Sequence, residues 1–341
     1  MSFRSMVAGI GHYLPKNCVK NADLPAHLNT SDEWIRERTG IAQRFLASTE
    51  ETTAFMAANA ATLALKMAGI DASCVDAIVL ATTTPDNGFP ATATRVQALL
   101  GANKAFAFDV QAVCSGFVYA LAVADNFIKA GQAKTVLLIG AESMSRLIDW
   151  NDRGTCVLFG DGAAALVLTA IETDDDTSAT FHSANTNNTK FRNAHKRGVL
   201  STHLYSDGSG YDLLYVDHSI ETPSKRGAVV MHGREIFKSA VKKIGEAVEK
   251  ALIANNLKVT DIDWFVPHQA NERIIKGVID HFHLPHEKVV MTVDKHANTS
   301  AASIPLALCA AVNDGRIKPG QLVLIEAMGG GLTWASSIIR W

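Results

Sequence analysis

The feature that most constrains the fold of this chain is a faint internal repeat, in which four segments recur in the same order. The first copy reads "VDAIVLATTTPDN", "KAFAFDVQAVCSGF", "GQAKTVLLIGAES" and "GDGAAALVL". The second copy reads "IDWFVPHQANERI", "EKVVMTVDKHANTSAAS", "GQLVLIEAMGG" and "GGGLTWASSII". The spacings between the segments agree closely in the two copies. Two copies of one α/β unit are the simplest explanation.

Short apolar runs alternate with longer segments of helical periodicity in both copies, which is typical of α/β proteins with buried sheets. The predicted strands span residues 77–82, 105–110, 135–139, 164–169, 264–266, 289–293, 322–326 and 336–339. The predicted helices include residues 52–68, 115–130, 235–255 and 300–314. We therefore expect an α/β fold made of two similar halves, residues 1–173 and residues 198–341.

The predicted halves are separated by a polar segment, residues 174–197, which is rich in Asn and Thr and has little periodicity. Such a composition is typical of an inserted surface loop. Asp174, Asp175 and Asp176 open this segment and raise the question of a metal site. Because a run of acidic residues is more often solvated than a ligand set, we favour the loop.

The overall composition argues against several classes of protein. The net charge of −2 provides no general basic field for nucleic acid. No apolar run approaches the roughly 20 residues that span a bilayer, and the N-terminal residues turn polar too soon for a secretory signal. The five scattered cysteines form no CxxC pair, which argues against a disulfide framework or a zinc site. We therefore expect a cytoplasmic protein without a membrane or nucleic-acid partner.

Cys114 stands at an unusual position, between a predicted strand and a predicted helix in "FDVQAVCSGFVYAL". A cysteine taken alone is more often a small buried apolar residue. At the N-terminus of a helix, however, the helix dipole favours the thiolate form. The position therefore suggests that Cys114 is a nucleophile, while the other four cysteines are expected only to pack.

Further polar residues follow predicted strands of the second copy, where ligands of open α/β sheets collect. They are His268, Asn298 and the glycine run 329–331, and the repeat places Asn298 close to the position of Cys114. A thiolate attacks thioesters, and backbone N–H groups at Cys114 and at the glycine run can form an oxyanion hole. His268 and Asn298 can both donate hydrogen bonds to a carbonyl oxygen and stabilise an enolate. An acidic third member of a hydrolase triad is not obvious.

These residues belong to motifs distributed over nearly the whole chain. The motifs are "NTSDEWIRERTGI", "DRGT", "FGDGAAA", "VPHQANERI", "NTSAAS" and "GGGLTW". In this combination the sequence resembles the β-ketoacyl-acyl-carrier-protein synthases III, the initiating condensing enzymes of bacterial fatty acid synthesis. The resemblance implies the thiolase-like fold, with two pseudo-duplicated α/β halves forming a layered α-β-α-β-α core.

The resemblance also assigns residues. The implied catalytic residues are Cys114, His268, Asn298 and Gly330, the last as second oxyanion donor. The implied contacts of coenzyme A or its pantetheine arm are Thr30, Trp34, Arg38, Arg153, Gly233, Phe237, Ala270 and Asn271. The implied carrier-protein contacts are Lys238, Gln269, Ala270, Asn271, Glu272 and Arg273. The implied acyl pocket contains Met328 and, from across a homodimer, Phe89.

The implied reaction joins a short acyl-coenzyme A, with acetyl expected, to malonyl-acyl-carrier protein. Loss of CO₂ drives formation of a 3-oxoacyl-carrier protein, so the resemblance implies no metal and no cofactor. Two alternatives stay open. One is another thiolase-superfamily acyltransferase, such as a polyketide or quinolone-type starter enzyme. The other is a non-catalytic carrier-binding partner, against which the cysteine nucleophile counts.

Three more patterns have competing interpretations. The histidines of "HFHLPH" suggest a metal, but a solvated turn is favoured because no other ligand lies nearby in sequence. "FGDGAAA" resembles a dinucleotide loop but precedes a strand, so cofactor binding is not expected. Arg234, Lys238 and Lys242 share one helix face, which is either solvated or a docking patch for an acidic carrier protein.

The chain departs from the usual residue of the family that it resembles at four positions, Met328, Leu332, Arg234 and Ala297.

Overall fold

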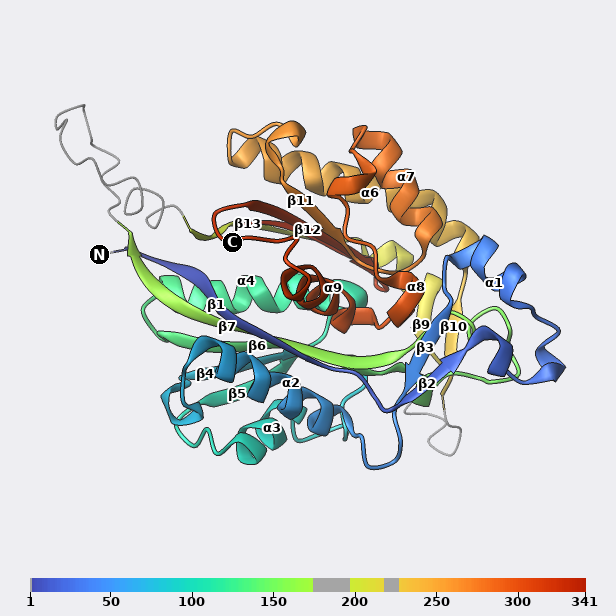
Figure 1. Ribbon diagram of the computed structural model, residues 1–341, viewed down its shortest axis with the longest axis horizontal. Helices are drawn as coiled ribbons and strands as arrows, with labels where there is room; N and C mark the ends of the chain where they lie inside the picture. Colours follow the sequence, from blue (N-terminus) through green and yellow to red (C-terminus); the bar gives the residue numbers. More distant parts are fainter. Residues whose placement is uncertain (1, 174–196, 218–226) are drawn as a thin grey trace.

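The computed structural model describes residues 2–173, 197–217 and 227–341, which form two main β-sheets with helices between and outside them (Figure 1). From one face to the other, the layers are helices, a five-stranded sheet, central helices, a four-stranded sheet and helices again. This is the α-β-α-β-α core that the family resemblance implies, and the predicted fold class is confirmed. Within these residues, no helix has the length and apolar character needed to cross a membrane.

The first sheet consists of β1 (Ser2–Tyr13), β4 (Ala77–Ala81), β5 (Phe106–Val110), β6 (Thr135–Ser143) and β7 (Asp161–Thr173). Its strand order is β1-β7-β6-β4-β5. Strand β4 is parallel to β5 and β6, whereas β7 is antiparallel to β1 and β6. The carboxyl ends of the parallel strands therefore meet at one edge, as in other open α/β sheets.

The second sheet consists of β8 (Gly198–Ser206), β11 (Trp264–Pro267), β12 (Leu322–Gly329) and β13 (Thr333–Arg340). Its order, taken from β8, is β8-β13-β12-β11, with β11 parallel to β12 and β13 antiparallel to both of its neighbours. This order matches β1-β7-β6-β4 of the first sheet strand for strand. The internal repeat in the sequence thus corresponds to a repeat of topology.

The strand predicted for residues 289–293 is wrong. Only an isolated bridge between Phe265 and Val289 remains of it, where the repeat would place the equivalent of β5. The side chain of Gln269 forms hydrogen bonds with the backbone of this segment. Its Oε1 accepts from Thr292 N at 2.7 Å and its Nε2 donates to Val290 O at 3.0 Å. A side-chain amide thus satisfies backbone groups that a neighbouring strand would otherwise use.

Helices α4 (Gly116–Lys129) and α9 (Ser303–Asn313) lie between the two sheets (Figure 1). They bury residues on most of their circumference, as expected for helices covered on both sides. The outer layers are amphipathic helices that bury one face only. They are α2 (Thr53–Ala68) and α3 (Thr92–Leu100) on the first sheet, and α6 (Gly233–Ala254) and α7 (Glu272–Phe282) on the second.

The smaller elements lie together at one end of the molecule, on the right in Figure 1. They are α1 (Asp32–Thr39), α8 (Val293–His296) and two strand pairs, β2 (Asn17–Lys20) with β3 (Gln43–Leu46) and β9 (Leu214–Val216) with β10 (Val229–Met231). None of these was predicted from the sequence. Short, half-exposed elements carry too little periodicity to be recognised.

Strand β1 was also missed, because "SFRSMVAGIGHY" contains glycines that resemble turn residues. In the structure, Gly9 and Gly11 let β1 pack directly on the backbone of α2. A Cβ atom on Gly9 would lie 2.4 Å from Ala64 O, and one on Gly11 would lie 2.3 Å from Ala60 O. These glycines serve close approach and not a turn.

The predicted inserted loop, residues 174–197, lies almost wholly outside the described residues, as do Asp174, Asp175 and Asp176. Strand β7 ends at Thr173 and β8 begins at Gly198. The domain limits placed at these residues remain a prediction.

Candidate active site

Cys114 lies in a short 3-10 turn, Val113–Ser115, between β5 and the start of α4 at Gly116. Its side chain is buried, and burial raises the pKa of the Cys114 thiol to about 12, with a further increase from the nearby Glu142. The expected thiolate is therefore corrected to a thiol in the resting protein. A helix N-terminus offers at most about 2 kcal/mol to an anion, and here desolvation outweighs it.

The backbone before Cys114 is strained. Val113 has φ of 47°, a left-handed conformation that is rare for a β-branched residue. Such strain persists only where surrounding contacts hold it. In this turn Ser115 N donates to Ala112 O at 3.1 Å, and the Ser115 hydroxyl lies 2.6 Å from Thr333 Oγ1. The turn fixes Cys114 with its backbone N–H near the glycine run.

His268 directly follows β11 and is 6% exposed. Its Nδ1 lies 2.6 Å from the hydroxyl of Ser303, the first residue of α9. Its Nε2 is buried without a hydrogen-bond partner in the described chain. Because burial disfavours the charged ring, the pKa of His268 falls to about 3. The imidazole is therefore neutral at physiological pH.

Asn298 is fixed by its backbone and by its side-chain oxygen. Asn298 N donates to Leu158 O at 2.9 Å, and Gly160 N donates to Asn298 O at 3.1 Å. Its Oδ1 accepts from Ser300 N at 2.9 Å, and the Nδ2 group on the other side of the amide can donate a hydrogen bond to a ligand. The preceding Ala297 has φ of 57°, in the region that favours glycine.

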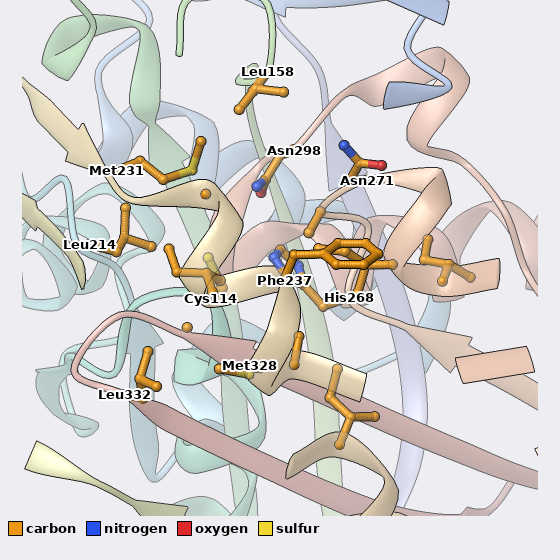
Figure 2. A pocket seen from close by; sticks show the side chains of 18 of the residues that line it. Cys114, Leu158, Leu214, Met231, Phe237, His268, Asn271, Asn298, Met328 and Leu332 are labelled. Atoms are coloured by element: carbon orange, nitrogen blue, oxygen red, sulfur yellow. The ribbon is translucent and has the colours of Figure 1, made fainter. Parts of the chain in front are cut away.

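Cys114, His268 and Asn298 line one cavity, and Figure 2 shows their side chains gathered at its centre. Besides the turn that carries Cys114, the main elements that line the cavity are α6, α7 and β12. Its walls are otherwise mainly apolar. Among the wall residues are Leu158, Leu214, Met231, Ile236, Phe237, Ala240, Ile244, Ile274, Ile275, Met328 and Leu332. Met328, expected in the acyl pocket, is thus part of this cavity.

The glycine run lies against the nucleophile. A Cβ atom on Gly329 would stand 2.7 Å from Cys114 N, so a larger residue would displace the turn. Gly330 and Gly331 line a second cavity, which also contains Cys114. Cys114 therefore lines both cavities, and the glycine run contributes Gly329 to the first and Gly330 and Gly331 to the second.

Basic residues surround the mouth of the first cavity. Arg38, Arg234, Lys238 and Arg273 line a hollow with Gly233, Phe237 and Asn271, three residues that also line the cavity or its opening. Beside it the Trp34 ring faces two guanidinium groups, Arg38 at 4.5 Å and Arg153 at 5.3 Å. Ala270 lines the cavity, and Thr30 is half-buried just before α1. The structure thus brings most of the expected coenzyme A residues to one region.

Two residues that the resemblance assigns to carrier-protein contact, Gln269 and Glu272, are less accessible than that role would require. Gln269 is fully buried, and its amide bonds only backbone groups of its own chain, so its side chain cannot meet a partner. That assignment is wrong. Glu272 is half-buried and pairs with Lys276 at 3.0 Å, whereas Arg273 is exposed.

Phe89, which was expected in the acyl pocket, is 88% exposed and lines neither cavity that contains Cys114.

Sequence reasoning missed two buried carboxyl groups near Cys114. Glu326, on β12, lines the cavity at 2% exposure, and its Oε2 has no hydrogen-bond partner in the described chain. Burial raises the pKa of Glu326 to about 8. The available signal was a single acidic residue inside the apolar strand "LVLIEAMG". A charge there is unusual and often functional.

The second missed carboxyl group, Glu142, connects the two halves beneath Cys114. It accepts from Thr84 Oγ1 at 2.6 Å and Thr83 N at 3.1 Å in the first half, and from Ala301 N at 3.4 Å in the second. It is fully buried, and burial raises the pKa of Glu142. Glu142 thus joins residues 83–84 to Ala301, and it is close enough to Cys114 to contribute to the raised pKa of that thiol.

Two other interpretations can be compared with the structure. "FGDGAAA" leads into β7, where Asp161 accepts from Ala47 N at 2.7 Å and Ser145 N at 2.8 Å. The prediction that this motif enters a strand is confirmed. In residues 2–173, 197–217 and 227–341, no group of three His, Cys, Asp or Glu side chains could hold a metal ion.

Two duplicated α/β halves, with a cysteine at their junction, define the class of thiolase-like acyl-transferring enzymes. Family models agree: 3-oxoacyl-[acyl-carrier-protein] synthase III matches residues 108–187, and its C-terminal domain matches residues 252–341. The chain belongs to the β-ketoacyl-[acyl-carrier-protein] synthase III family.

Individual relatives support this membership over the full length. The β-ketoacyl-[acyl-carrier-protein] synthases III of Paramagnetospirillum magneticum and Granulibacter bethesdensis are 58% and 56% identical to this chain. The first comparison covers 100% of both chains, and the second covers 99% of both. The crystal structure of 3-oxoacyl-[acyl-carrier-protein] synthase III from Aquifex aeolicus is 44% identical, covers 99% of this chain and 100% of its own, and superposes with a TM-score of 0.87.

Proposed function

We propose that this enzyme condenses a short acyl-coenzyme A, preferably acetyl-coenzyme A, with malonyl-acyl-carrier protein to begin fatty acid synthesis. Carbon dioxide is released and a 3-oxoacyl-carrier protein is formed. The observation that carries this proposal is the cavity that brings together the Cys114 thiol, the neutral His268 imidazole and the Asn298 amide. A thiol receives an acyl group, and two neutral donors stabilise an enolate.

In the first step, the Cys114 sulfur attacks the thioester carbonyl of the acyl-coenzyme A. The tetrahedral oxyanion accepts hydrogen bonds from the backbone N–H groups of Cys114 and Gly330, an oxyanion hole of the usual kind. The new C–S bond forms on Cys114 and the bond to coenzyme A breaks. Because the resting thiol is protonated, its proton leaves with the coenzyme A sulfur.

In the second step, His268 and Asn298 hold the thioester carbonyl of the malonyl group. As CO₂ departs, its electron pair becomes an enolate whose oxygen is stabilised by both donors. The enolate carbon attacks the acyl-cysteine carbonyl, and the Cys114 thiolate leaves and takes up a proton from solvent. Because His268 is neutral, it stabilises the enolate by a hydrogen bond and not by full charge.

The basic mouth fits the polar ends of both substrates. Coenzyme A carries phosphates, and carrier proteins are acidic, so both are attracted to the hollow lined by Arg38, Arg234, Lys238 and Arg273. The apolar walls receive the uncharged pantetheine arm. We propose that no metal or redox cofactor takes part, because loss of CO₂ supplies the driving force.

The proposal is tested by intact-mass measurement after incubation with acetyl-, butyryl- and octanoyl-coenzyme A. A mass increase equal to one acyl group, retained on the peptide that contains Cys114, is expected. The acylated enzyme should then form a 3-oxoacyl product with malonyl-carrier protein but not with malonyl-coenzyme A. Product from malonyl-coenzyme A alone would favour a starter enzyme of another pathway.

The basic hollow yields a prediction about carrier docking. Lys238→Glu and Arg273→Glu should each raise the KM for malonyl-carrier protein severalfold and weaken its dependence on salt, since exposed charges act through screened attraction. Self-acylation should change less in Lys238→Glu. The measurement is KM against ionic strength.

A matched control for this prediction is Lys242→Glu, one turn further along α6. Lys242 is exposed, lies outside the hollow and is 3.9 Å from Glu246. Its reversal should leave KM unchanged. An equal rise in all three variants would mean that only total charge matters, and the docking patch would be rejected.

We also propose that the enzyme works as a homodimer in which Phe89 of one copy limits the acyl pocket of the other. The support is twofold: Phe89 is almost fully exposed in the single chain, and β5 is an edge strand of the first sheet. An exposed edge strand is a common pairing surface.

Replacing Phe89 should therefore change primer length. Phe89→Ala should raise the ratio of kcat/KM for octanoyl- to acetyl-coenzyme A, because each methylene in such a pocket is worth about 1–3 kcal/mol. The variant must first be shown to be dimeric. Ile253→Ala, which removes another exposed apolar side chain, should keep the wild-type ratio. An unchanged ratio in dimeric Phe89→Ala would exclude Phe89 as the limiting residue.

A further inference from the structure

One residue holds the imidazole of His268. The hydroxyl of Ser303 lies 2.6 Å from His268 Nδ1, and the same oxygen accepts a hydrogen bond from the backbone N–H of Gln269 at 3.3 Å. Ser303 is buried at the start of α9. The other ring nitrogen, Nε2, belongs to the side chain that lines the cavity and has no partner in the described chain. The protons in this small network can therefore be counted.

A backbone N–H can only donate, so Ser303 Oγ is an acceptor toward Gln269. If Oγ also accepted from an Nδ1–H group, the hydroxyl hydrogen would be buried with no acceptor in the described contacts. An unsatisfied buried polar group costs about 1–3 kcal/mol. If the hydroxyl instead donates to Nδ1, all three groups are satisfied. Nδ1 then carries no hydrogen, and the hydrogen of the neutral ring is on Nε2.

We propose that Ser303 is a positioning residue that fixes neutral His268 in the tautomer with its hydrogen on Nε2. Given the proposed function, this makes His268 a hydrogen-bond donor to the malonyl thioester carbonyl. It also prevents His268 from acting as the base that deprotonates Cys114. In this tautomer Nε2 carries a hydrogen, and the lone pair of Nδ1 accepts the hydrogen bond from Ser303, so neither nitrogen can take a proton from the thiol. The Cys114 S–H bond then breaks as an S–H bond forms on departing coenzyme A.

The same short segment orients the second donor. Ser300 N donates to Asn298 Oδ1 at 2.9 Å. This bond fixes which end of the Asn298 amide is the oxygen, so the Nδ2 group points the other way and can donate to a substrate. Residues 298–303 therefore set both donors, one through a backbone N–H and the other through a hydroxyl. Within the "NTSAAS" motif, Ser300 acts through its backbone and Ser303 through its side chain.

The tautomer can be observed directly by ¹⁵N NMR of protein labelled at histidine. The His268 signals are assigned by their absence from His268→Ala. In the wild type, Nε2 should show the shift of a protonated nitrogen and Nδ1 that of an unprotonated one. In Ser303→Ala this preference should be lost, and in Ser303→Thr, which retains the hydroxyl, it should be restored.

Activity gives a second readout. In Ser303→Ala, CO₂ release from malonyl-carrier protein should fall by between tenfold and the roughly 10²–10³-fold typical of losing the donor itself. Self-acylation of Cys114 should fall much less, and Ser303→Thr should recover most of the loss. Ser337→Ala is the matched control, because it removes another buried hydroxyl, which bonds Ser201 O at 2.8 Å. It should keep both rates.

A wild-type spectrum with hydrogen on Nδ1 overturns the proposal, even if Ser303→Ala fails to fold. So does a folded Ser303→Ala protein with the wild-type tautomer and wild-type CO₂ release. The spectrum does not depend on the reaction. If the protein forms no condensation product and yet shows the Nε2 tautomer, the proposed function fails while the assignment to Ser303 stands.

Discussion

Cys114→Ala should abolish acyl transfer to the protein, whereas His268→Ala and Asn298→Ala should still accept an acyl group from acyl-coenzyme A. The physical reason is the division of roles that we propose for the cavity: Cys114 is the nucleophile, and His268 and Asn298 are the side-chain donors to the malonyl carbonyl. Loss of either donor should slow CO₂ release by about 10²–10³-fold. Intact mass and ¹⁴CO₂ release measure the two steps separately.

The matched control for this prediction is Cys74→Ala, which removes an exposed thiol and should behave as wild type in both assays. Acylated His268→Ala protein that releases CO₂ at the wild-type rate would disprove the role of His268. Acylation that persists in Cys114→Ala would assign the nucleophile to another residue. Either result would leave the family membership intact and change the assignment of the site.

Glu326→Gln should stabilise the protein at neutral and alkaline pH but not in acid. In the folded protein burial raises the pKa of Glu326 to about 8, well above the ordinary carboxyl value. Between these two pKa values the unfolded chain gives up the proton and the folded chain keeps it. The contribution of Glu326 to wild-type stability therefore falls as pH rises through this window and levels off above pH 8. The glutamine side chain does not ionise in this pH range, so the variant does not lose this part of the free energy of unfolding as pH rises.

The expected gain in the free energy of unfolding is on the order of 3 kcal/mol at pH 7 and close to zero below pH 4. Urea unfolding of both proteins at several pH values measures it. Glu246→Gln, which changes an exposed residue on α6, should show no pH-dependent difference. A gain that is the same at pH 4 and pH 8 would mean that packing, and not ionisation, explains the effect of Glu326→Gln.

Much of the candidate site could be predicted because its residues occupy repeated positions. Cys114, His268 and Asn298 each follow a strand or its equivalent, and the repeat indicated that they would meet. The direction of the Cys114 pKa could not be predicted in this way. The helix N-terminus is visible in the sequence, whereas the burial that outweighs it depends on both sheets packing around the thiol.

The same limit explains the errors. Gln269 looks like a surface residue in "VPHQANERI", and only the structure shows that its amide replaces strand pairing for Thr292 and Val290. Glu326 was passed over because its apolar neighbours made the strand easy to recognise. Polar residues that serve the interior have no periodicity of their own, so sequence patterns assign them to the wrong environment.

The correspondence of the two halves has a consequence for how such a site can arise. Cys114 and Asn298 come from equivalent parts of the repeat, and the turns Val113–Ser115 and Ser300–Ala302 contact each other across the junction. In a symmetric pair of identical half-length chains, equivalent positions would have to carry the same amino acid. Fusing the halves into one gene removes that restriction. One position can then mutate toward nucleophilicity while its counterpart is selected for hydrogen bonding, so covalent linkage permits chemical asymmetry within a nearly symmetric scaffold.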